Sequence, residues 1–78
     1  MYNYSITNYD TEEAKGVFST LTKAYSFCVK NLKPLGLSNF IIAEHDENFD
    51  HCVSVNVAEF VFEFEENGLT DFEVFCPW

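Results

Sequence analysis

The chain has 78 residues, 47% of them hydrophobic, and its 13 acidic and 4 basic side chains give a net charge of −9. A chain of this length forms one domain, residues 1–78, and buries only about 60% of the surface that its unfolded form exposes. The negative charge and the absence of arginine exclude conventional binding of nucleic acid, which needs a basic surface.

The first strand is predicted at the N-terminus, where Tyr2, Tyr4 and Ile6 alternate with small polar residues. The opening residues include neither the basic nor the apolar region of a secretory signal, and no apolar run approaches the roughly 20 residues of a membrane-spanning helix. The three cysteines stand far apart and match no disulfide framework, so we expect buried thiols in a reducing compartment. The sequence therefore predicts a cytoplasmic protein without membrane contact, located in the host cytoplasm if a phage encodes it.

A long helix is predicted next. Asp10 and Glu13 have the three-residue spacing of a capping box, and apolar residues then recur three and four positions apart as far as Leu32. Pro34 ends this pattern. The helix is therefore expected to run from Asp10 to about Lys33, with all four lysines of the chain on the side away from its apolar stripe.

Strands are predicted to follow the helix. The segments NFIIAEH, residues 39–45, and CVSVNV, residues 52–57, are rich in β-branched residues, and the second alternates cleanly. The apolar residues then move to the even positions from Phe60 to Phe64. Because such a shift moves side chains to the other face of a strand, it indicates a bulge or a tight corner near Ala58.

The last two strands are predicted to form a hairpin around Asn67 and Gly68. A three-residue loop, residues 67–69, places apolar residues opposite one another, Phe64 with Phe72 and Phe62 with Val74. The elements then follow the order β-α-β-β-β. This order predicts a two-layer α+β fold in which one helix packs on a mostly antiparallel sheet.

The same register places carboxylates opposite one another on the other face of the hairpin. The opposed pairs are Glu63 with Glu73 and Glu65 with Asp71, and Glu59 lies further along the same strand. Opposed like charges cost up to about 1 kcal/mol for each pair. Residues 34–78 contain ten acidic residues and no basic one, so nothing nearby in sequence compensates for this cost.

Two interpretations of this acidic face remain open. It is either a solvated strand face that keeps an aromatic-rich chain soluble, or a surface that binds a basic partner. Alternate residues of a strand are about 6.6–6.8 Å apart, which is comparable with the separation of neighbouring phosphates along a nucleic-acid strand. Further candidates for partner binding are charged or aromatic residues outside the apolar pattern: Asp46, Glu47, Phe49, Asp50 and Phe75.

No motif predicts catalysis or a metal site. Cys52 follows His51, but neighbours on a strand point to opposite faces, and the chain has neither a phosphate-binding loop nor a nucleophile elbow. The segment EHDENFDHC, residues 44–52, contains metal-ligand residue types without a zinc or EF-hand spacing. We therefore expect neither an enzyme nor a cofactor or metal.

In its small size, acidity, cytosolic character and lack of a catalytic motif, the chain resembles the small acidic inhibitors of phages and mobile elements, among them anti-CRISPR and DNA-mimic anti-restriction proteins. The resemblance implies a protein that blocks access of DNA or RNA to a basic nucleic-acid-binding protein, such as a CRISPR effector complex or a restriction-type enzyme. The alternatives are an immunity or antitoxin protein that caps a cognate toxin, and a structural subunit of an assembly.

Overall fold

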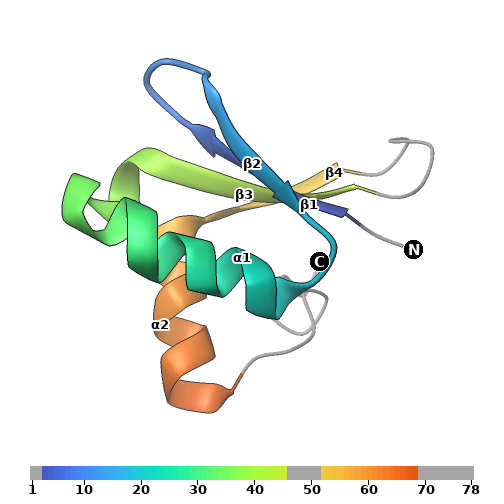
Figure 1. The fold of residues 1–78 in the computed structure, drawn as a ribbon, viewed down its shortest axis with the longest axis vertical. Helices are drawn as coiled ribbons and strands as arrows, with labels where there is room; N and C mark the ends of the chain where they lie inside the picture. The colour runs from blue at the N-terminus through green and yellow to red at the C-terminus, as the bar shows by residue number, and fades with distance from the viewer. Residues whose placement is uncertain (1–2, 46–51, 69–78) are drawn as a thin grey trace.

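The computed structural model describes residues 3–45 and 52–68, which form four strands and two α-helices in the order ββαββα (Figure 1). The strands are β1 (Asn3–Asn8), β2 (Ala14–Phe18), β3 (Phe40–His45) and β4 (Cys52–Asn56), and the helices are α1 (Leu21–Phe27) and α2 (Val57–Asn67). Helix α1 continues as a π-helical turn (Cys28–Leu32), and two short 3-10 helices (Lys33–Leu35 and Leu37–Asn39) lead to β3. The predicted α+β class, with a helix packed on an antiparallel sheet, is confirmed, but the order of the elements differs in two places.

The sheet has the strand order β2-β1-β3-β4, and all neighbouring strands are antiparallel. Both helices lie on one face of it (Figure 1), where α1 packs on β1 and β2 while α2 packs on β3 and β4. Alternate residues of β3 are buried under the helices. The core consists of ten apolar residues from all of these layers: Ile6, Leu21, Ala24, Cys28, Leu32, Phe40, Ile42, Val57, Phe60 and Val61.

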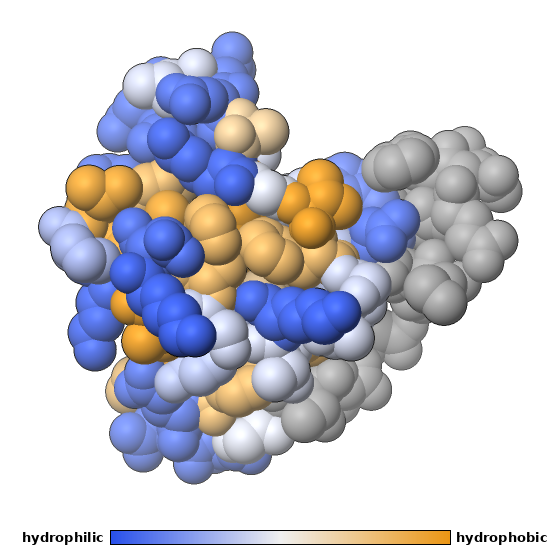
Figure 2. Space-filling model, in the orientation of Figure 1, coloured by the Kyte–Doolittle hydropathy of each residue, from blue (hydrophilic) through white to orange (hydrophobic). Residues whose placement is uncertain are grey.

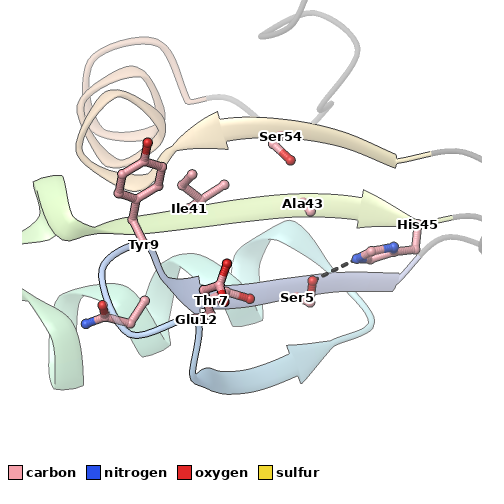
Figure 3. Close-up of a pocket in the computed structure, with 9 residues that line it drawn as sticks. Ser5, Thr7, Tyr9, Glu12, Ile41, Ala43, His45 and Ser54 are labelled. Carbon is pink, nitrogen blue, oxygen red and sulfur yellow. Dashed lines mark hydrogen bonds between the residues drawn. The ribbon is translucent and has the colours of Figure 1, made fainter.

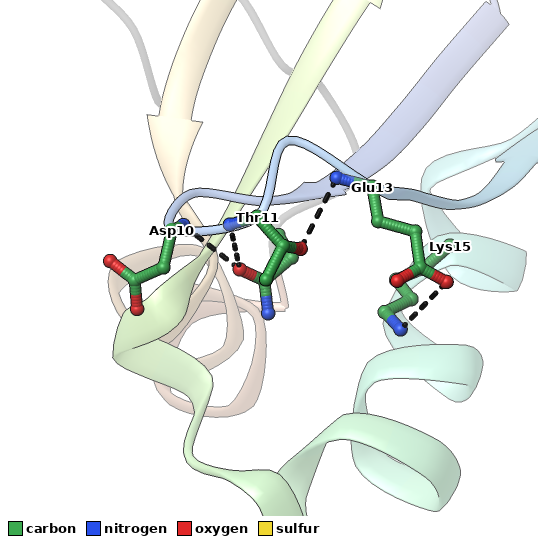
Figure 4. A network of polar contacts seen from close by, with 5 residues as sticks. Asp10, Thr11, Glu13 and Lys15 are labelled. Atoms are coloured by element: carbon green, nitrogen blue, oxygen red, sulfur yellow. Dashed lines mark hydrogen bonds and ion pairs between the residues drawn. The ribbon is translucent and has the colours of Figure 1, made fainter.

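The first difference is that the expected helix begins ten residues later than predicted. The Asn8 side-chain oxygen accepts hydrogen bonds from the backbone N–H groups of Asp10 and Thr11, both at 2.9 Å (Figure 4). This turn opens a β-hairpin, so Asp10 caps no helix. Residues 14–18 then form β2: Val17 and Phe18 favour a strand, and Gly16 is unfavourable inside a helix.

Helix α1 begins after Thr20, whose side-chain oxygen accepts a hydrogen bond from the backbone N–H of Lys23 at 3.2 Å. Its buried stripe continues through Cys28 to Leu32, as the spacing predicted. Burial raises the pKa of the Cys28 thiol to about 12, so this thiol stays protonated at neutral pH and packs as a small hydrophobe.

The second difference is that residues 57–67 form helix α2 and not a strand. The Asn56 side-chain oxygen caps its start by accepting hydrogen bonds from the N–H groups of Ala58 at 2.8 Å and Glu59 at 3.4 Å. At its end, Gly68 has the left-handed φ of +63°, and its N–H donates to the Phe64 carbonyl at 3.0 Å. The shift in apolar pattern near residue 58 is therefore the boundary between β4 and this helix.

The buried side of α2 explains why the strand prediction was wrong. Val57, Phe60 and Val61 are buried, and Phe64 packs against the core beside them. These positions recur at the three- and four-residue spacing of a helix. A strand would have buried Phe62, which is 60% exposed. The expected partners of that strand, including Phe72 and Val74, lie outside the described residues.

Candidate interaction surface

Helix α2 presents its acidic residues on the side opposite the core. Glu59, Phe62, Glu63 and Glu66 fall within an arc of about 100° on the helix, at 100° per residue. The side chains of Glu59 and Glu66 are exposed and that of Glu63 is half-buried. We call these four residues the α2 acidic surface.

Phe62 gives this surface an aromatic centre. Its side chain is 60% exposed, although it lies among three carboxylates. Together with Ala58, Glu59 and Glu63 it lines a shallow depression of about 280 Å³. An exposed aromatic ring beside a hollow is the kind of anchor that carries much of the binding energy in protein interfaces.

The charges of α2 are unfavourable for the helix itself. Three of its acidic residues, Glu63, Glu65 and Glu66, lie in its C-terminal half, and its last turn contains no basic residue. Carboxylates at this end oppose the helix dipole, at a cost of about 0.3–1 kcal/mol each. Glu59 and Glu63 are also four residues apart, and a like-charge pair at this spacing costs about 0.2–0.5 kcal/mol. The carboxylates near the C-terminal end of α2 therefore lower the stability of the helix, whereas Glu59, in its first turn, interacts favourably with the helix dipole.

Glu65 belongs to a different contact. Its carboxylate accepts a hydrogen bond from the Tyr25 hydroxyl of α1 at 3.2 Å. The Tyr25 ring stacks on Phe64 with a centroid distance of 4.1 Å. Partial desolvation of the tyrosine, followed by the negative charge of Glu65, raises the pKa of Tyr25 above its ordinary value. Glu65 thus joins the two helices and lies away from the α2 acidic surface.

The structure brings together two of the ten residues predicted to bind a partner. Glu59 and Glu63 share one side of α2, while Glu65 faces α1. The predicted rows of carboxylates along a strand are wrong for residues 59–65, because these residues are helical. The other seven predicted residues lie outside the described part of the chain: Asp46, Glu47, Phe49, Asp50, Asp71, Glu73 and Phe75.

The sequence reasoning missed Phe62 and Glu66 as members of the surface. The alternation of phenylalanines from 60 to 64 predicts a core position for Phe62, and a strand pattern gives Glu66 no place among the opposed carboxylates. Helical spacing from Glu59 would have identified both, since they follow it by three and seven residues.

A second feature is a polar groove on the sheet face that the helices leave open. It has a volume of about 540 Å³, and its residues include Ser5, Thr7 and Tyr9 of the N-terminal segment together with Ala43 and His45 of β3 (Figure 3). The Ser5 hydroxyl and the His45 Nε2 atom are hydrogen-bonded at 2.8 Å, a geometry that also occurs between a nucleophile and its base. Both β1 and β3 are paired on two sides, so their ladder N–H groups are not free to stabilise an oxyanion at this serine.

In the histidine- and acid-rich segment that begins at Glu44, the side chains that the structure describes do not gather at one site. Glu44 is buried on the helix-covered face of β3, and His45 points to the open face. Within residues 3–45 and 52–68, no three histidine, cysteine or acidic side chains gather as metal ligands would.

None of the helices in the described part of the chain combines the length and apolarity needed to cross a bilayer. Comparison of the chain with protein-family models, with curated proteins and with solved structures finds no match.

Proposed function

We propose that this protein is a non-enzymatic inhibitor that binds a basic nucleic-acid-binding protein and blocks its access to DNA or RNA. The α2 acidic surface is the contact region in this proposal. The observation that carries it is the exposure of Phe62 among Glu59, Glu63 and Glu66, on a helix whose stability is lowered by the carboxylates near its C-terminal end.

The charge pattern of α2 fits a groove that evolved to hold phosphates. Glu59 and Glu63 are separated by about 6 Å along the helix axis, and Glu63 and Glu66 by about 4.5 Å. A row of carboxylates at this spacing meets the lysine and arginine side chains that otherwise contact a nucleic-acid backbone. Phe62 adds an apolar contact at the centre, where desolvation strengthens the neighbouring ion pairs.

The proposed partner is a CRISPR effector complex or a restriction-type enzyme in the cytoplasm of a host cell. This class of partner follows from the resemblance to small acidic phage inhibitors and from the charge of −9. Inhibition would be stoichiometric, because the protein occupies a binding site and turns nothing over. It would also need no metal or cofactor.

Affinity capture from a nuclease-treated bacterial lysate tests this proposal. The wild-type bait is expected to retain a basic nucleic-acid-binding protein that a Phe62→Ala/Glu63→Gln/Glu66→Gln bait does not retain. A control bait, Leu35→Ala/Asp10→Asn/Glu12→Gln, loses one exposed hydrophobic residue and two charges elsewhere. It should capture the same protein as the wild type.

Equal capture by all three baits would refute the role of the α2 acidic surface. Retention of one small toxin, and of no nucleic-acid-binding protein, would favour an immunity or antitoxin function instead.

A further inference from the structure

The open face of the sheet differs from the rest of the surface in its charge. The residues that the strand registers place on this face are Asn3, Ser5, Thr7, Ala14, Val17, Ile41, Ala43, His45, Ser54 and Asn56. None of these paired residues is an acid, a lysine or an arginine, although 22% of the chain is charged. Lys15 stands at the register shift of β2, and its ammonium group is 3.5 Å from the Glu13 carboxylate. Among the residues of the groove, only Glu12 at the rim carries a carboxylate.

Such a face is unusual for a strongly acidic protein. The solvated side of an antiparallel sheet ordinarily has polar and charged residues, which keep it soluble. Depletion of charge is instead the feature that distinguishes the core of a protein interface from the remaining surface. The open face therefore shares the low charge of an interface core.

The open face is uneven in shape. Ser5, Ala43 and Ser54 lie directly opposite one another on three adjacent strands, and their small side chains form the floor of the groove. Tyr9 beside this floor and Val17 on β2 are each 67% exposed, and the Tyr9 ring stands at one end of the groove (Figure 3). One molecule thus carries both a hollow and projecting side chains, as a two-fold symmetric contact requires.

We propose that a second copy of this chain covers the open face, so that two sheets stack in a symmetric dimer. Stacked sheets lie about 10 Å apart. Four strands at a spacing of about 4.8 Å, each about five residues long, present a face of roughly 19 by 17 Å. Two such faces have a flat area of roughly 650 Å², and surface corrugation brings the buried area towards the lower limit for a specific interface, about 1,000 Å². We therefore expect a weak dimer and not an obligate one.

Electrostatics favours this side of the molecule for self-association. Two chains that each carry a charge of −9 repel one another, and a contact through the open face brings almost no carboxylates together. The helices lie on the opposite side of the sheet (Figure 1), so the α2 acidic surfaces of both copies stay exposed. The dimer therefore goes beyond the proposed inhibition: it would present two contact regions for the basic partner, one on each outer side.

Sedimentation velocity over 1 μM to 1 mM protein tests the dimer. The wild type should pass from monomer to dimer across this range, and Ala43→Lys and Ser54→Lys should each weaken the dimer at least about 10-fold, because a lysine would be buried without a partner. Both side chains point away from the core, so the variants should keep the wild-type circular dichroism and melting temperature. Thr22→Lys, on the exposed side of α1, makes the same charge change and should dimerise as the wild type does.

Each lysine variant reduces the net negative charge of the chain to −8. This smaller charge would by itself favour association. A loss of dimer therefore reports on the open face. A wild type that is monomeric at 1 mM, or a dimer that survives both Ala43→Lys and Ser54→Lys, would overturn the inference. Added salt separates this inference from the proposed function, because it should strengthen a dimer of like-charged chains and weaken a complex with a basic partner.

Discussion

Replacement of Phe60 by alanine is expected to unfold the protein, whereas the same replacement at Phe62, two residues along α2, is expected to leave it folded. Phe60 is fully buried and lies with its ring centroid 5.9 Å from that of Phe64. Removal of a buried phenylalanine side chain costs about 3–5 kcal/mol. A domain of this size has a total stability of about 4–12 kcal/mol, so this loss removes much or all of it.

Phe62 has the opposite environment. Because its side chain is mostly exposed, its removal should change the free energy of unfolding by less than about 0.5 kcal/mol. Urea denaturation followed by circular dichroism would measure both variants under the same conditions. If Phe62→Ala were the more destabilised of the two, residues 57–67 would pair as the strand that the alternating phenylalanines first predicted.

Neutralising the C-terminal charges of α2 is expected to stabilise the protein and weaken its binding. Glu63→Gln/Glu66→Gln removes two carboxylates from the negative end of the helix dipole and one like-charge pair with Glu59. The glutamine at position 63 can still accept the hydrogen bond that the Asn67 amide now donates at 2.5 Å. We expect a gain of about 1 kcal/mol, which raises the melting temperature of a domain this size by about 4–8 °C.

Binding should change in the opposite direction, because the same carboxylates provide charge complementarity to a basic partner. Melting temperature and affinity for the captured partner would be measured on one preparation of this variant. Asp10→Asn/Glu12→Gln, in the turn between β1 and β2, serves as the charge-matched control and should keep the wild-type affinity. Higher stability with undiminished affinity would mean that the charges of α2 only keep the protein soluble.

The α+β class was predictable from the sequence because several elements have one unambiguous period. The buried stripe from Leu21 to Leu32 follows helical spacing, and β4 alternates cleanly. Helix α2 was not predicted, because Phe60 and Phe64 fit both a strand and a helix, and only Val61 and Phe62 distinguish the two. The decisive local signals were Asn56 three residues before Glu59 and Gly68 after the last turn, which cap a helix at both ends.

The error at the start of α1 has a different physical cause. Asp10 and Glu13 have the spacing of a capping box, but the side chain of Asn8 accepts hydrogen bonds from the same backbone region and holds it in a turn. The spacing of residues along the sequence does not show which side chain will accept hydrogen bonds from those backbone N–H groups. Because Lys15 therefore lies on β2 and pairs with Glu13 at 3.5 Å, the four lysines do not share one side of a helix as expected.

The candidate surface was predictable in its chemistry and not in its geometry. An excess of carboxylates without basic neighbours is visible in composition, and it identified Glu59 and Glu63. The arrangement of these residues depends on the secondary structure that carries them. Once residues 57–67 are helical, Glu65 turns towards Tyr25, and the exposed Phe62 lies on the same side of the helix as Glu59 and Glu63.

Competition between this protein and nucleic acid tests the central claim most directly. The captured basic protein would be loaded with a fluorescently labelled oligonucleotide that it binds, and this protein would be titrated into the complex while fluorescence anisotropy is followed. We expect the wild type to release the oligonucleotide at a stoichiometry near one α2 acidic surface per binding site, and the Phe62→Ala/Glu63→Gln/Glu66→Gln variant to release far less. A ternary complex, in which the inhibitor binds while the oligonucleotide stays bound, would contradict the proposal that the α2 acidic surface occupies the nucleic-acid site.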